Sequence, residues 1–278
     1  MGEHIAGKAI VITGAGGGFG RLVAEKAAAR GARVTCGDID EPAARETAQV
    51  IAALGGQAQA FAADVTRMED VASLVQGSLD AYGAIDVMVN NAGIMPLAFF
   101  SDHAAAHAAW SRCIDVNIKG VLNGMIAAYD PMMAAGRGQI VNISSIYGNF
   151  PVVGAAVYGA SKAAVNFLSE SFRLETRGKI KVTTVKPTGV PETGLGRSVV
   201  NREAVVGILG ANMPSYMQLL AELREGRLSA DELDPEAMAY ASLAPAHIAD
   251  AVLHAIDQPW GVSIGEITVR AAGDLFVL

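Results

Sequence analysis

Apolar runs typical of β-strands alternate along the chain with alanine-rich stretches whose apolar positions recur at helical spacing. Strands are predicted at residues 8–14, 32–38, 57–65, 85–93, 138–145, 180–187 and 262–269. Strands that alternate with helices form βαβ units, which build a parallel sheet with helices on both faces. We therefore predict a single-domain α/β protein over residues 1–278, with a Rossmann-like, doubly wound parallel sheet of about seven strands.

Two of the predicted helices carry clear terminal signals. The segment 41–56 begins with an acidic residue and a proline and ends with two glycines, which is typical of a helix start and stop. The segment 66–83 begins with Thr66 and has Glu69 three residues later. This spacing predicts a capping box, in which each side chain binds the backbone N–H of the other residue.

The alternation of strands and helices breaks between residues 190 and 245. This stretch holds several short helical patterns, frequent prolines and the apolar residues Met213, Tyr216 and Met217, which we expect to be exposed. It follows the carboxyl end of the sixth predicted strand, and ligands of doubly wound sheets bind at such ends. A long insertion at this place predicts a substrate lid. The alternative is a surface subdomain without a role in binding.

Composition and charge exclude several classes of protein. The 278 residues are 51% hydrophobic and 18% charged, which is enough apolar material for a large core, and the net charge is -7. No run of about eighteen apolar residues is free of charge, so no membrane span is predicted. Lysine and arginine do not cluster, so nucleic acid is not an expected partner.

The cysteines, Cys36 and Cys113, are too few for a disulfide framework and do not have a metal-site spacing. The N-terminal stretch also lacks the basic region and long apolar core of a secretory signal, so a cytoplasmic location is expected. His103 and His107 have a helical i, i+4 spacing, but an H-E-x-x-H motif and a third ligand are missing. These histidines are interpreted as a solvated helix face, and no metal is predicted.

The segment "TGAGGGFG", from Thr13 to Gly20, lies between the first predicted strand and a predicted helix. Backbone amides at such a helix start can hold a diphosphate. Its glycines Gly14, Gly18 and Gly20 have the spacing G-x-x-x-G-x-G, and Phe19 stands where the commoner G-x-G-x-x-G motif has its last glycine. No Gly-Lys-Ser/Thr follows, which excludes a P-loop. The segment predicts a dinucleotide site, with a structural turn as the alternative.

Asp38 ends the second predicted strand, about 20 residues after the glycine turn. An acid at this place accepts hydrogen bonds from the ribose hydroxyls of the adenosine and repels a 2′-phosphate. Ile39 follows where a basic residue could have bound that phosphate. The pattern therefore favours NAD over NADP. The alternative is that Asp38 caps the following helix.

Two tyrosines occupy the stretch "SSIYGNFPVVGAAVYGASK", and they differ in the residue found four positions further on. Lys162 comes four residues after Tyr158, one helical turn along the same face. Four residues after Tyr147 lies Pro151. The spacing thus selects Tyr158 as the tyrosine that is paired with a lysine.

Five motifs in fixed order resemble those of the short-chain dehydrogenase/reductase family, of the NAD-preferring type. They are "TGAGGGFG", "NNAG" at residues 90–93, the asparagine of "VN" at Asn117, "NISS" ending at Ser145, and "YGASK" at residues 158–162. The resemblance covers nearly the whole chain. It implies a Rossmann fold, a dinucleotide cofactor and an assembly of two or four subunits.

The resemblance implies a catalytic tetrad of Asn117, Ser145, Tyr158 and Lys162. The family's serine precedes its tyrosine by about a dozen residues, a count that reaches Ser145 and not Ser144. Tyr158 is then the general acid or base, Ser145 holds the substrate oxygen, and Lys162 binds the nicotinamide ribose. Asn117 is similar to the residue that positions a water for proton relay. The alternative for Asn117 is a helix residue whose side chain binds a neighbouring backbone.

A tyrosine has an unperturbed pKa of about 10, which is too high for a base near neutral pH. A neighbouring ammonium and the positive charge of an oxidised nicotinamide both favour the phenolate. We therefore expect Lys162 and the cofactor to lower the pKa of Tyr158. A lowering of about 3 units corresponds to about 4 kcal/mol.

Further cofactor contacts are implied by the resemblance alone. Asp64 and Val65 are similar to the pair that meets adenine, although Asp64 is equally well explained as a loop acid. Asn91, Ala92 and Gly93 are expected to border the cofactor ribose.

The segment "VKPTGVPET" departs from the family pattern after the sixth strand. Pro187 precedes Thr188, the glycine comes one place late, and Glu192 takes the usual threonine position with Thr193 next. Pro187, Val190 and Thr193 are the residues expected to contact the nicotinamide half of the cofactor.

The substrate side is expected to be apolar, which suggests a bulky or cyclic secondary alcohol or ketone. The residues expected to line it, besides the lid, are Met95, Pro96, Ile146, Tyr147 and Val152. Each of them is equally well explained as core. The leading hypothesis is an NAD-dependent alcohol dehydrogenase or ketone reductase acting on a small molecule. The alternatives are an isomerase or lyase that keeps its NAD bound, and a non-catalytic NAD-binding sensor or scaffold.

Overall fold

The computed structural model describes residues 4–191 and 193–277. These residues form a seven-stranded parallel sheet with the order β3-β2-β1-β4-β5-β6-β7. The strands are β1 (Ala9–Thr13), β2 (Arg33–Asp38), β3 (Gln57–Ala62), β4 (Val87–Asn90), β5 (Gly138–Ile143), β6 (Ile180–Pro187) and β7 (Glu266–Val269). The predicted doubly wound sheet is confirmed, and each predicted strand contains the observed one.

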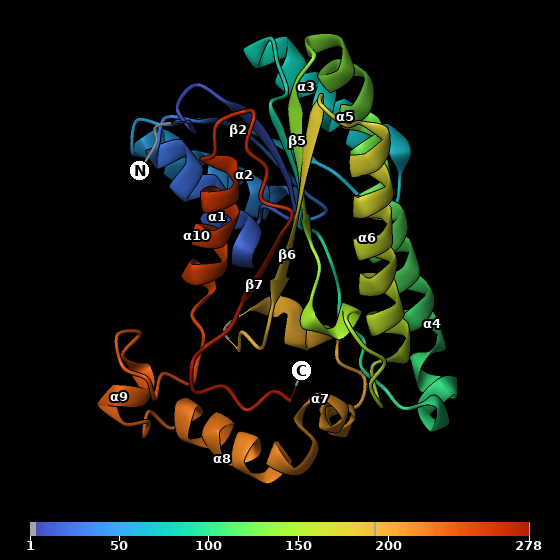
Figure 1. The fold of residues 1–278 in the computed structure, drawn as a ribbon, viewed down its shortest axis with the longest axis vertical. Helices are drawn as coiled ribbons and strands as arrows, with labels where there is room; N and C mark the ends of the chain where they lie inside the picture. The colour runs from blue at the N-terminus through green and yellow to red at the C-terminus, as the bar shows by residue number, and fades with distance from the viewer. Residues whose placement is uncertain (1–3, 192, 278) are drawn as a thin grey trace.

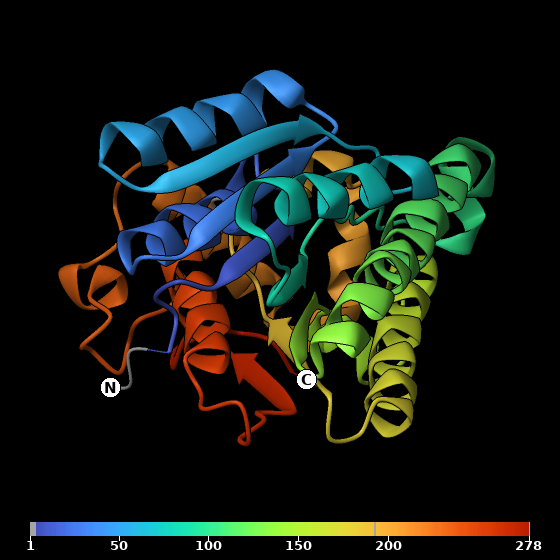
Figure 2. The ribbon, with the colours of Figure 1, turned by 90° about the horizontal axis from the view of Figure 1, so that it is seen from above.

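Helices cover both faces of the sheet (Figures 1 and 2). One face packs against α1 (Gly18–Ala29), α2 (Glu41–Ala53) and α10 (Pro245–Ile256). The other packs against α3 (Met68–Tyr82), α5 (Gly120–Ala135) and α6 (Ala156–Glu175). The helix α4 (His103–Ile114) runs on into α5 through a π-helical segment, η2 (Asp115–Lys119). Two short 3-10 helices, η1 (Phe100–Asp102) and η3 (Ile146–Gly148), lie in the connecting loops.

Burial along the strands explains why the sequence shows apolar runs instead of strict alternation. Every residue of β1, β5 and β6 is buried, because helices lie against both faces of a parallel sheet. Successive residues still alternate between two cores. Val185 belongs to the core under α1 and α10, whereas Val182 packs with Val165 of α6.

The predicted capping box of the third helix is wrong. The helix α3 starts at Met68 after Arg67, and no side chain caps it. The hydroxyl of Thr66 instead donates a hydrogen bond of 2.8 Å to the carboxylate of Asp64, and Glu69 forms an ion pair with Arg67. A loop acid two residues earlier therefore competes successfully for the hydroxyl that the pattern assigned to the helix end.

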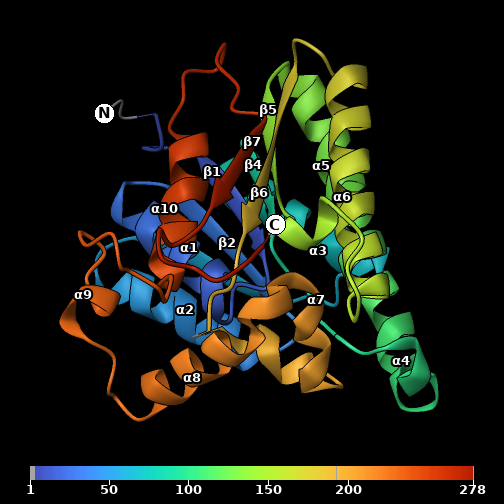
Figure 3. The same ribbon diagram turned by 60° about the horizontal axis from the view of Figure 1, so that its bottom comes forward.

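The segment between β6 and α10 folds into a row of short helices below the carboxyl ends of the strands (Figures 1 and 3). They are η4 (Gly194–Ser198), η5 (Arg202–Val205), α7 (Val206–Leu209), η6 (Gly210–Asn212), α8 (Met213–Arg224) and α9 (Ala230–Leu233). Of the residues expected to be exposed, Met217 is, at 47%. Met213 and Tyr216 instead pack against the apolar cluster that contains Tyr158.

An 18-residue window within the stretch Arg202–Arg224 has a mean hydropathy of 1.2, and by length and composition alone the stretch could cross a membrane. It is the one such stretch among the described residues, and only 17% of its most apolar part is buried. Gly210, with φ of 53°, separates α7 from α8 within it. One such stretch is weak evidence for a span, because the helices it contains are short.

The C-terminal tail returns from β7 toward the insertion (Figure 3) and is tied to it by hydrogen bonds. The N–H of Val277 donates to the carbonyl of Ile208 at 3.0 Å, and Nδ2 of Asn212 donates to the carbonyl of Leu275 at 2.9 Å. The ring of Phe276 lies 5.6 Å from that of Tyr216. The tail thus fixes α7 and α8 to the rest of the molecule.

Candidate active site

The glycine turn lies at the carboxyl end of β1 and is held very tightly. A Cβ atom on Gly20 would lie 2.1 Å from the carbonyl oxygen of Gly14, so only glycine fits there. Gly14 and Gly18 have φ values of 67° and 52°, which glycine adopts at low cost. The amide of Asn91 donates to the carbonyls of Thr13 and Gly14, each at 3.0 Å, and so joins the loop after β4 to the turn.

Asp38 at the end of β2 lies against this turn. Its carboxylate accepts a hydrogen bond of 2.9 Å from the N–H of Gly16 and another of 2.9 Å from the N–H of Asp40. The cap of α2 is Asp40, which accepts from the N–H of Ala43. Asp38 is therefore not the helix cap, and its place beside the glycine turn is the one expected of a ribose-binding acid.

The turn provides a cradle that fits a dinucleotide. A Cβ on Gly16 would lie 2.9 Å from the carboxylate of Asp38, whereas a Cβ on Gly17 or Gly18 would meet no atom within 4 Å. The start of α1 at Gly18 therefore faces open space, and the first N–H groups of a helix have no partner within the helix. Phe19, expected near the cofactor, packs partly against the core under α1, and Ile39 is exposed.

Ser145, Tyr158 and Lys162 come together at the carboxyl end of β5. Ser145 caps η3, and its side chain lies close enough to the phenol of Tyr158 to lower the pKa of that phenol. Tyr158 and Lys162 lie one turn apart on α6, with Nζ of Lys162 5.8 Å from the centre of the tyrosine ring. All three are buried, at 6%, 3% and 5% exposure. Nζ of Lys162 also donates to the carbonyl of Ile143 at 2.8 Å.

The pKa of Tyr158 is shifted in the direction opposite to the expected one. Burial raises the pKa of this phenol, and the hydrogen bond with Ser145 only partly opposes the rise. Burial also lowers the pKa of Lys162 to about 8, with the nearby Cys113 acting in the other direction. In the protein alone the loss of solvation is therefore the dominant influence on this phenol. Our expectation combined Lys162 with the positive charge of an oxidised nicotinamide, and it stays a prediction for the protein with its cofactor.

Asn117 lies in the π-helical segment η2 and faces the loop after β4. Its Oδ1 accepts from the N–H of Ile94 and its Nδ2 donates to the carbonyl of Ile94, both at 2.9 Å. Nδ2 also donates to the hydroxyl of Ser161 at 3.0 Å and to the thiol of Cys113 at 3.3 Å. The side chain is thus satisfied by a neighbouring backbone, as in the alternative interpretation. The π-helix, which often marks functional sites, was not predicted.

Gly93 lies close to both Asn117 and Lys162. A Cβ on Gly93 would lie 3.3 Å from Oδ1 of Asn117 and 3.6 Å from Nζ of Lys162. Ala92, expected beside the ribose, donates its N–H to the hydroxyl of Thr13 at 3.2 Å. The loop after β4 is therefore bonded to β1 on one side and borders the Tyr–Lys pair on the other.

An apolar cluster contains Tyr158. The ring of Tyr147 meets that of Tyr158 edge-on, with centroids 5.4 Å apart, so the second tyrosine of the stretch lies beside the first. The cluster joins them to the insertion and the tail, and contains Met95, Leu97, Ile146, Val152, Ile208, Leu209 and Phe276. Four of the five expected lining residues belong to it. Pro96, the fifth, is buried and accepts a hydrogen bond from Trp110.

The remaining predicted cofactor residues lie at the same edge of the sheet. Asp64 follows β3. Burial acts to raise the pKa of its carboxyl, but hydrogen bonds from the N–H and the hydroxyl of Thr66 lower it, and the lowering is larger. Val65 accepts a hydrogen bond from Asn123 of α5 at its carbonyl. After Pro187, the hydroxyl of Thr193 donates to the carbonyl of Val190 at 3.1 Å. Glu192 lies outside the described residues.

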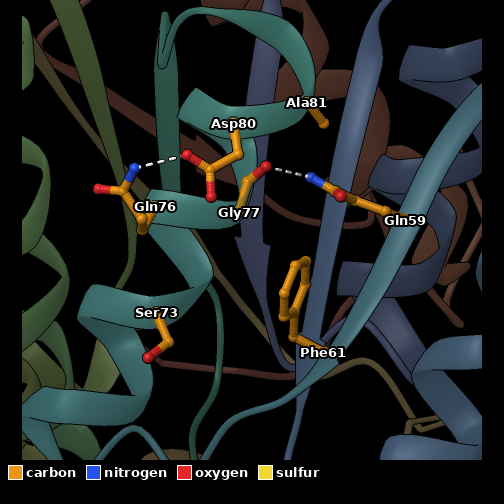
Figure 4. Close-up of a pocket in the computed structure, with 7 residues that line it drawn as sticks. All are labelled: Gln59, Phe61, Ser73, Gln76, Gly77, Asp80 and Ala81. Atoms are coloured by element: carbon orange, nitrogen blue, oxygen red, sulfur yellow. Dashed lines mark hydrogen bonds between the residues drawn. The ribbon is translucent and has the colours of Figure 1, made fainter.

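A cavity of about 440 Å³ opens elsewhere, between the edge strand β3 and α3 (Figure 4). Its lining residues are Gln59, Phe61, Ser73, Gln76, Gly77, Asp80 and Ala81, none of which is a predicted site residue. Gln59 and Gln76 are engaged in hydrogen bonds with Gly77 and Asp80, respectively. This cavity is separate from the candidate active site.

The glycine turn, the acid at the end of β2 and the open carboxyl edge of the sheet define a nucleotide-binding protein of the Rossmann class. The chain belongs to the short-chain dehydrogenase family. The family model described as short chain dehydrogenase matches residues 8–204, and the members of this family to which the chain is similar include oxidoreductases.

Two relatives illustrate the likeness in sequence. The oxidoreductase Lmo0432 of Listeria monocytogenes is 33% identical over 268 residues, which cover 95% of this chain and 96% of that protein. The 2,5-dichloro-2,5-cyclohexadiene-1,4-diol dehydrogenase LinX of Sphingobium indicum is 34% identical over 192 residues, or 68% of this chain and 76% of that protein.

Solved structures show the same fold with either form of the cofactor. A metagenomic short-chain oxidoreductase in complex with NADP is 30% identical, with a TM-score of 0.71 and coverage of 96% of this chain and 98% of that one. A short-chain dehydrogenase/reductase from Burkholderia phymatum in complex with NAD is 27% identical, with a TM-score of 0.74 and coverage of 95% and 89%. The likeness to these structures does not distinguish NAD from NADP for this chain.

Proposed function

We propose that the protein is an NAD(H)-dependent oxidoreductase that interconverts a secondary alcohol and a ketone, with Tyr158 as the general acid and base. The observation that carries this proposal is that Ser145, Tyr158 and Lys162 lie buried together at the edge of the sheet where the glycine turn lies. A bound nicotinamide supplies or accepts the hydride. The protein must then move one proton and hold one oxygen.

The raised pKa of Tyr158 suits the direction of ketone reduction. A phenol that keeps its proton can donate it to the oxygen of the substrate as negative charge develops there. Ser145, whose side chain lies close to the phenol of Tyr158, is proposed to hold the same oxygen. In the direction of alcohol oxidation the phenol must first lose its proton, which the positive charge of an oxidised nicotinamide would favour.

Lys162 is proposed to bind the nicotinamide ribose and to supply positive charge. Within the described part of the chain its Nζ donates one hydrogen bond, to Ile143, so an ammonium there retains further donors. Asn117 holds the loop at Ile94 in place; a role in positioning a water remains part of the proposal.

The preference for NAD over NADP is supported by Asp38. Its carboxylate lies within hydrogen-bond distance of the glycine turn, and a 2′-phosphate there would place two anions together. Ile39, the next residue, is 61% exposed and offers no charge to a phosphate. The other proposed cofactor contacts are those at Asp64, Val65, Pro187, Val190 and Thr193.

An apolar, bulky or cyclic substrate is supported by the cluster around Tyr147 and Tyr158, into which Ile208 and Phe276 also pack. The insertion at residues 190–245 is proposed as the lid over it. Burial raises the pKa of the Tyr147 phenol, so this residue is expected to stay neutral as a wall of the pocket.

Self-association and a cytoplasmic location are also part of the proposal. Helices α4, α5 and α6 carry the exposed apolar residues Ile114, Leu122, Ile126, Phe167 and Leu174. Apolar side chains gathered on neighbouring helices support a dimer or tetramer, which sedimentation would test. Cys36 and Cys113 are both free and buried, in keeping with a reducing compartment.

The proposal is tested by coenzyme kinetics with secondary alcohols and ketones of increasing size. We expect kcat/KM to be higher with NADH than with NADPH, and Tyr158→Phe to lower kcat by about 100-fold or more while NADH still binds. Tyr147→Phe is the matched control and should keep most of the turnover. Unchanged turnover by Tyr158→Phe would contradict the proposed proton transfer, and equal kcat/KM values for the two coenzymes would contradict the role of Asp38.

A further inference from the structure

Three buried side-chain atoms lack a hydrogen-bond partner among the described residues: Oδ1 of Asn90, Oε1 of Gln139 and Oγ1 of Thr188. Asn90 and Gln139 lie inside the sheet, and the amide nitrogens of both are bonded, to Asn142 and to Thr183 and Ala255. The hydroxyl of Thr188 has neither a donor nor an acceptor in that part of the chain. Leaving a buried hydroxyl unpaired is unfavourable, which suggests that a ligand pairs it.

Thr188 lies one residue beyond the carboxyl end of β6. Its N–H still donates to the carbonyl of Val269 of β7, at 3.1 Å, as that of Thr184 does to Gly265. The extended pairing with β7 therefore continues to Thr188, and so does the alternation of side chains between the two faces. Val182, six residues earlier on the same face, packs with Val165 of α6. The hydroxyl of Thr188 thus belongs to the face that α6 covers.

This face and this edge are those of the candidate active site. The helix α6 carries Tyr158 and Lys162. Ser144, at the end of β5, joins this helix to β6, because its hydroxyl donates to the carbonyl of Lys162 and its N–H donates to the carbonyl of Val185. The end of β6 therefore adjoins the Tyr–Lys pair. Ligands of doubly wound sheets bind beyond such strand ends.

We propose that the hydroxyl of Thr188 hydrogen-bonds to the nicotinamide half of the bound dinucleotide, and that its burial without a partner is a strain that the cofactor relieves. The inference rests on the proposed function and adds a residue that the motif pattern did not assign. Amide and phosphate oxygens of that half of the cofactor are suitable partners for a hydroxyl, which both donates and accepts.

The test compares Thr188→Val, which keeps the shape and removes the hydroxyl, with Thr188→Ser, which keeps the hydroxyl. NADH binding is measured by fluorescence titration, and thermal unfolding is measured without coenzyme. We expect Thr188→Val to raise the Kd for NADH by about 3- to 10-fold, the effect of one neutral hydrogen bond. Its unfolding temperature without coenzyme should equal or exceed that of the wild type, because an unpaired polar atom is removed. Thr188→Ser should bind NADH like the wild type.

AMP, which contains only the adenosine half, is the control ligand, and its Kd should be the same for all three proteins. Binding of NADH by Thr188→Val within twofold of the wild type would overturn the inference and leave the proposed function standing. An equal loss of NADH and AMP affinity would also overturn it, since it would indicate a general distortion. A wild-type protein that binds neither NADH nor NADPH would overturn the proposed function and this inference with it.

Discussion

Two buried lysines lie at opposite ends of the same sheet and differ in their hydrogen-bond partners. Lys162 adjoins the carboxyl end of β5, and Lys181 lies at the amino end of β6. They are 5% and 8% exposed, and burial lowers the pKa of both to about 8. A perturbed pKa by itself therefore does not identify the lysine that performs chemistry. The hydrogen bonds of the two amines differ, and these are more informative.

Lys181 is saturated by backbone oxygens. Its Nζ donates to the carbonyls of Gln258, Pro259 and Val262, at 3.5, 3.2 and 3.0 Å. These three residues follow the end of α10. An ammonium has three N–H donors, and a cation near the C-terminus of a helix is stabilising. The ring of Trp260 lies 5.4 Å away. Lys162 has one such bond within the described residues, to Ile143, and so keeps donors for a ligand.

The largest expected effect separates the two lysines by activity. Lys162→Met should lower kcat by about 100-fold or more, because the site loses its cation and the proposed ligand to the nicotinamide ribose. Lys181→Met should keep kcat within about twofold, since it lies at the other end of the sheet. The measurement is steady-state turnover of the best alcohol with NAD. Equal losses of kcat in both variants would contradict the prediction, because they would indicate that each substitution lowers turnover only by destabilising the fold.

For stability we expect the opposite order, with the larger loss in Lys181→Met. Lys181→Met removes a donor from three carbonyl groups, of which that of Pro259 keeps the N–H of Val262 as a partner. It is expected to lower the free energy of unfolding by about 2 kcal/mol. Lys162→Met removes one bond and also a poorly solvated amine, so the change should stay within about 1 kcal/mol. Urea unfolding of the proteins without coenzyme measures both. A larger loss for Lys162→Met would assign it the structural role.

The carboxyl and amino ends of the sheet also differ in how far the sequence predicts them. The glycine turn, Asp38 and the Tyr158–Lys162 spacing are local patterns, and the structure brings these residues to one edge of the predicted sheet. The role of Lys181 depends on carbonyls of residues 258–262, about 80 positions along the chain. No periodicity or spacing reports such a contact.

Other departures from prediction have physical reasons of the same kind. The hydroxyl of Thr66 binds Asp64 instead of capping α3, because two local acceptors compete. The π-helix at Asn117 arises within an uninterrupted helical pattern, so the sequence contains no break to detect. The pKa of Tyr158 depends on burial by the insertion and the tail, which a motif does not contain. Local chemistry was thus predictable, and its tuning was not.

A pair of glycines extends the comparison to the substrate side. A Cβ on Gly189, after β6, would lie 2.1 Å from the ring of Phe276, whereas one on Gly138, at the start of β5, would lie 2.4 Å from the sulfur of Met132. Both alanine variants should lose about 1 to 2 kcal/mol of stability through overpacking. Only Gly189→Ala should also raise KM several-fold, because Phe276 ties the tail to the proposed lid.

The control for the glycine pair is Gly194→Ala in the insertion, where a Cβ has no neighbour within 4 Å and no change is expected. The measurements are urea unfolding and the KM for the bulkiest ketone that is turned over. A raised KM in Gly138→Ala of the same size would contradict the assignment of the tail to the substrate side.

The smallest expected effect is the dependence of stability on pH, to which both lysines contribute. Both amines have a pKa of about 8 in the folded protein against 10.5 in the unfolded chain, so the unfolded state binds more protons between these values. Stability should therefore rise from pH 8 to pH 9, by at most about 1.4 kcal/mol per lysine. Above pH 9.0, the ordinary pKa of a thiol, other groups act in the opposite direction and lower the stability as the pH rises. Burial raises the pKa of Cys36 to about 12, and it also raises that of Tyr158. Urea unfolding at closely spaced pH values measures the slope, and each methionine variant should remove part of it. Burial also lowers the pKa of Lys8, so part of the slope should remain in the double variant Lys162→Met, Lys181→Met. A slope in the double variant equal to that of the wild type would contradict the prediction, because it would mean that these two lysines stay charged in the folded protein at pH 9.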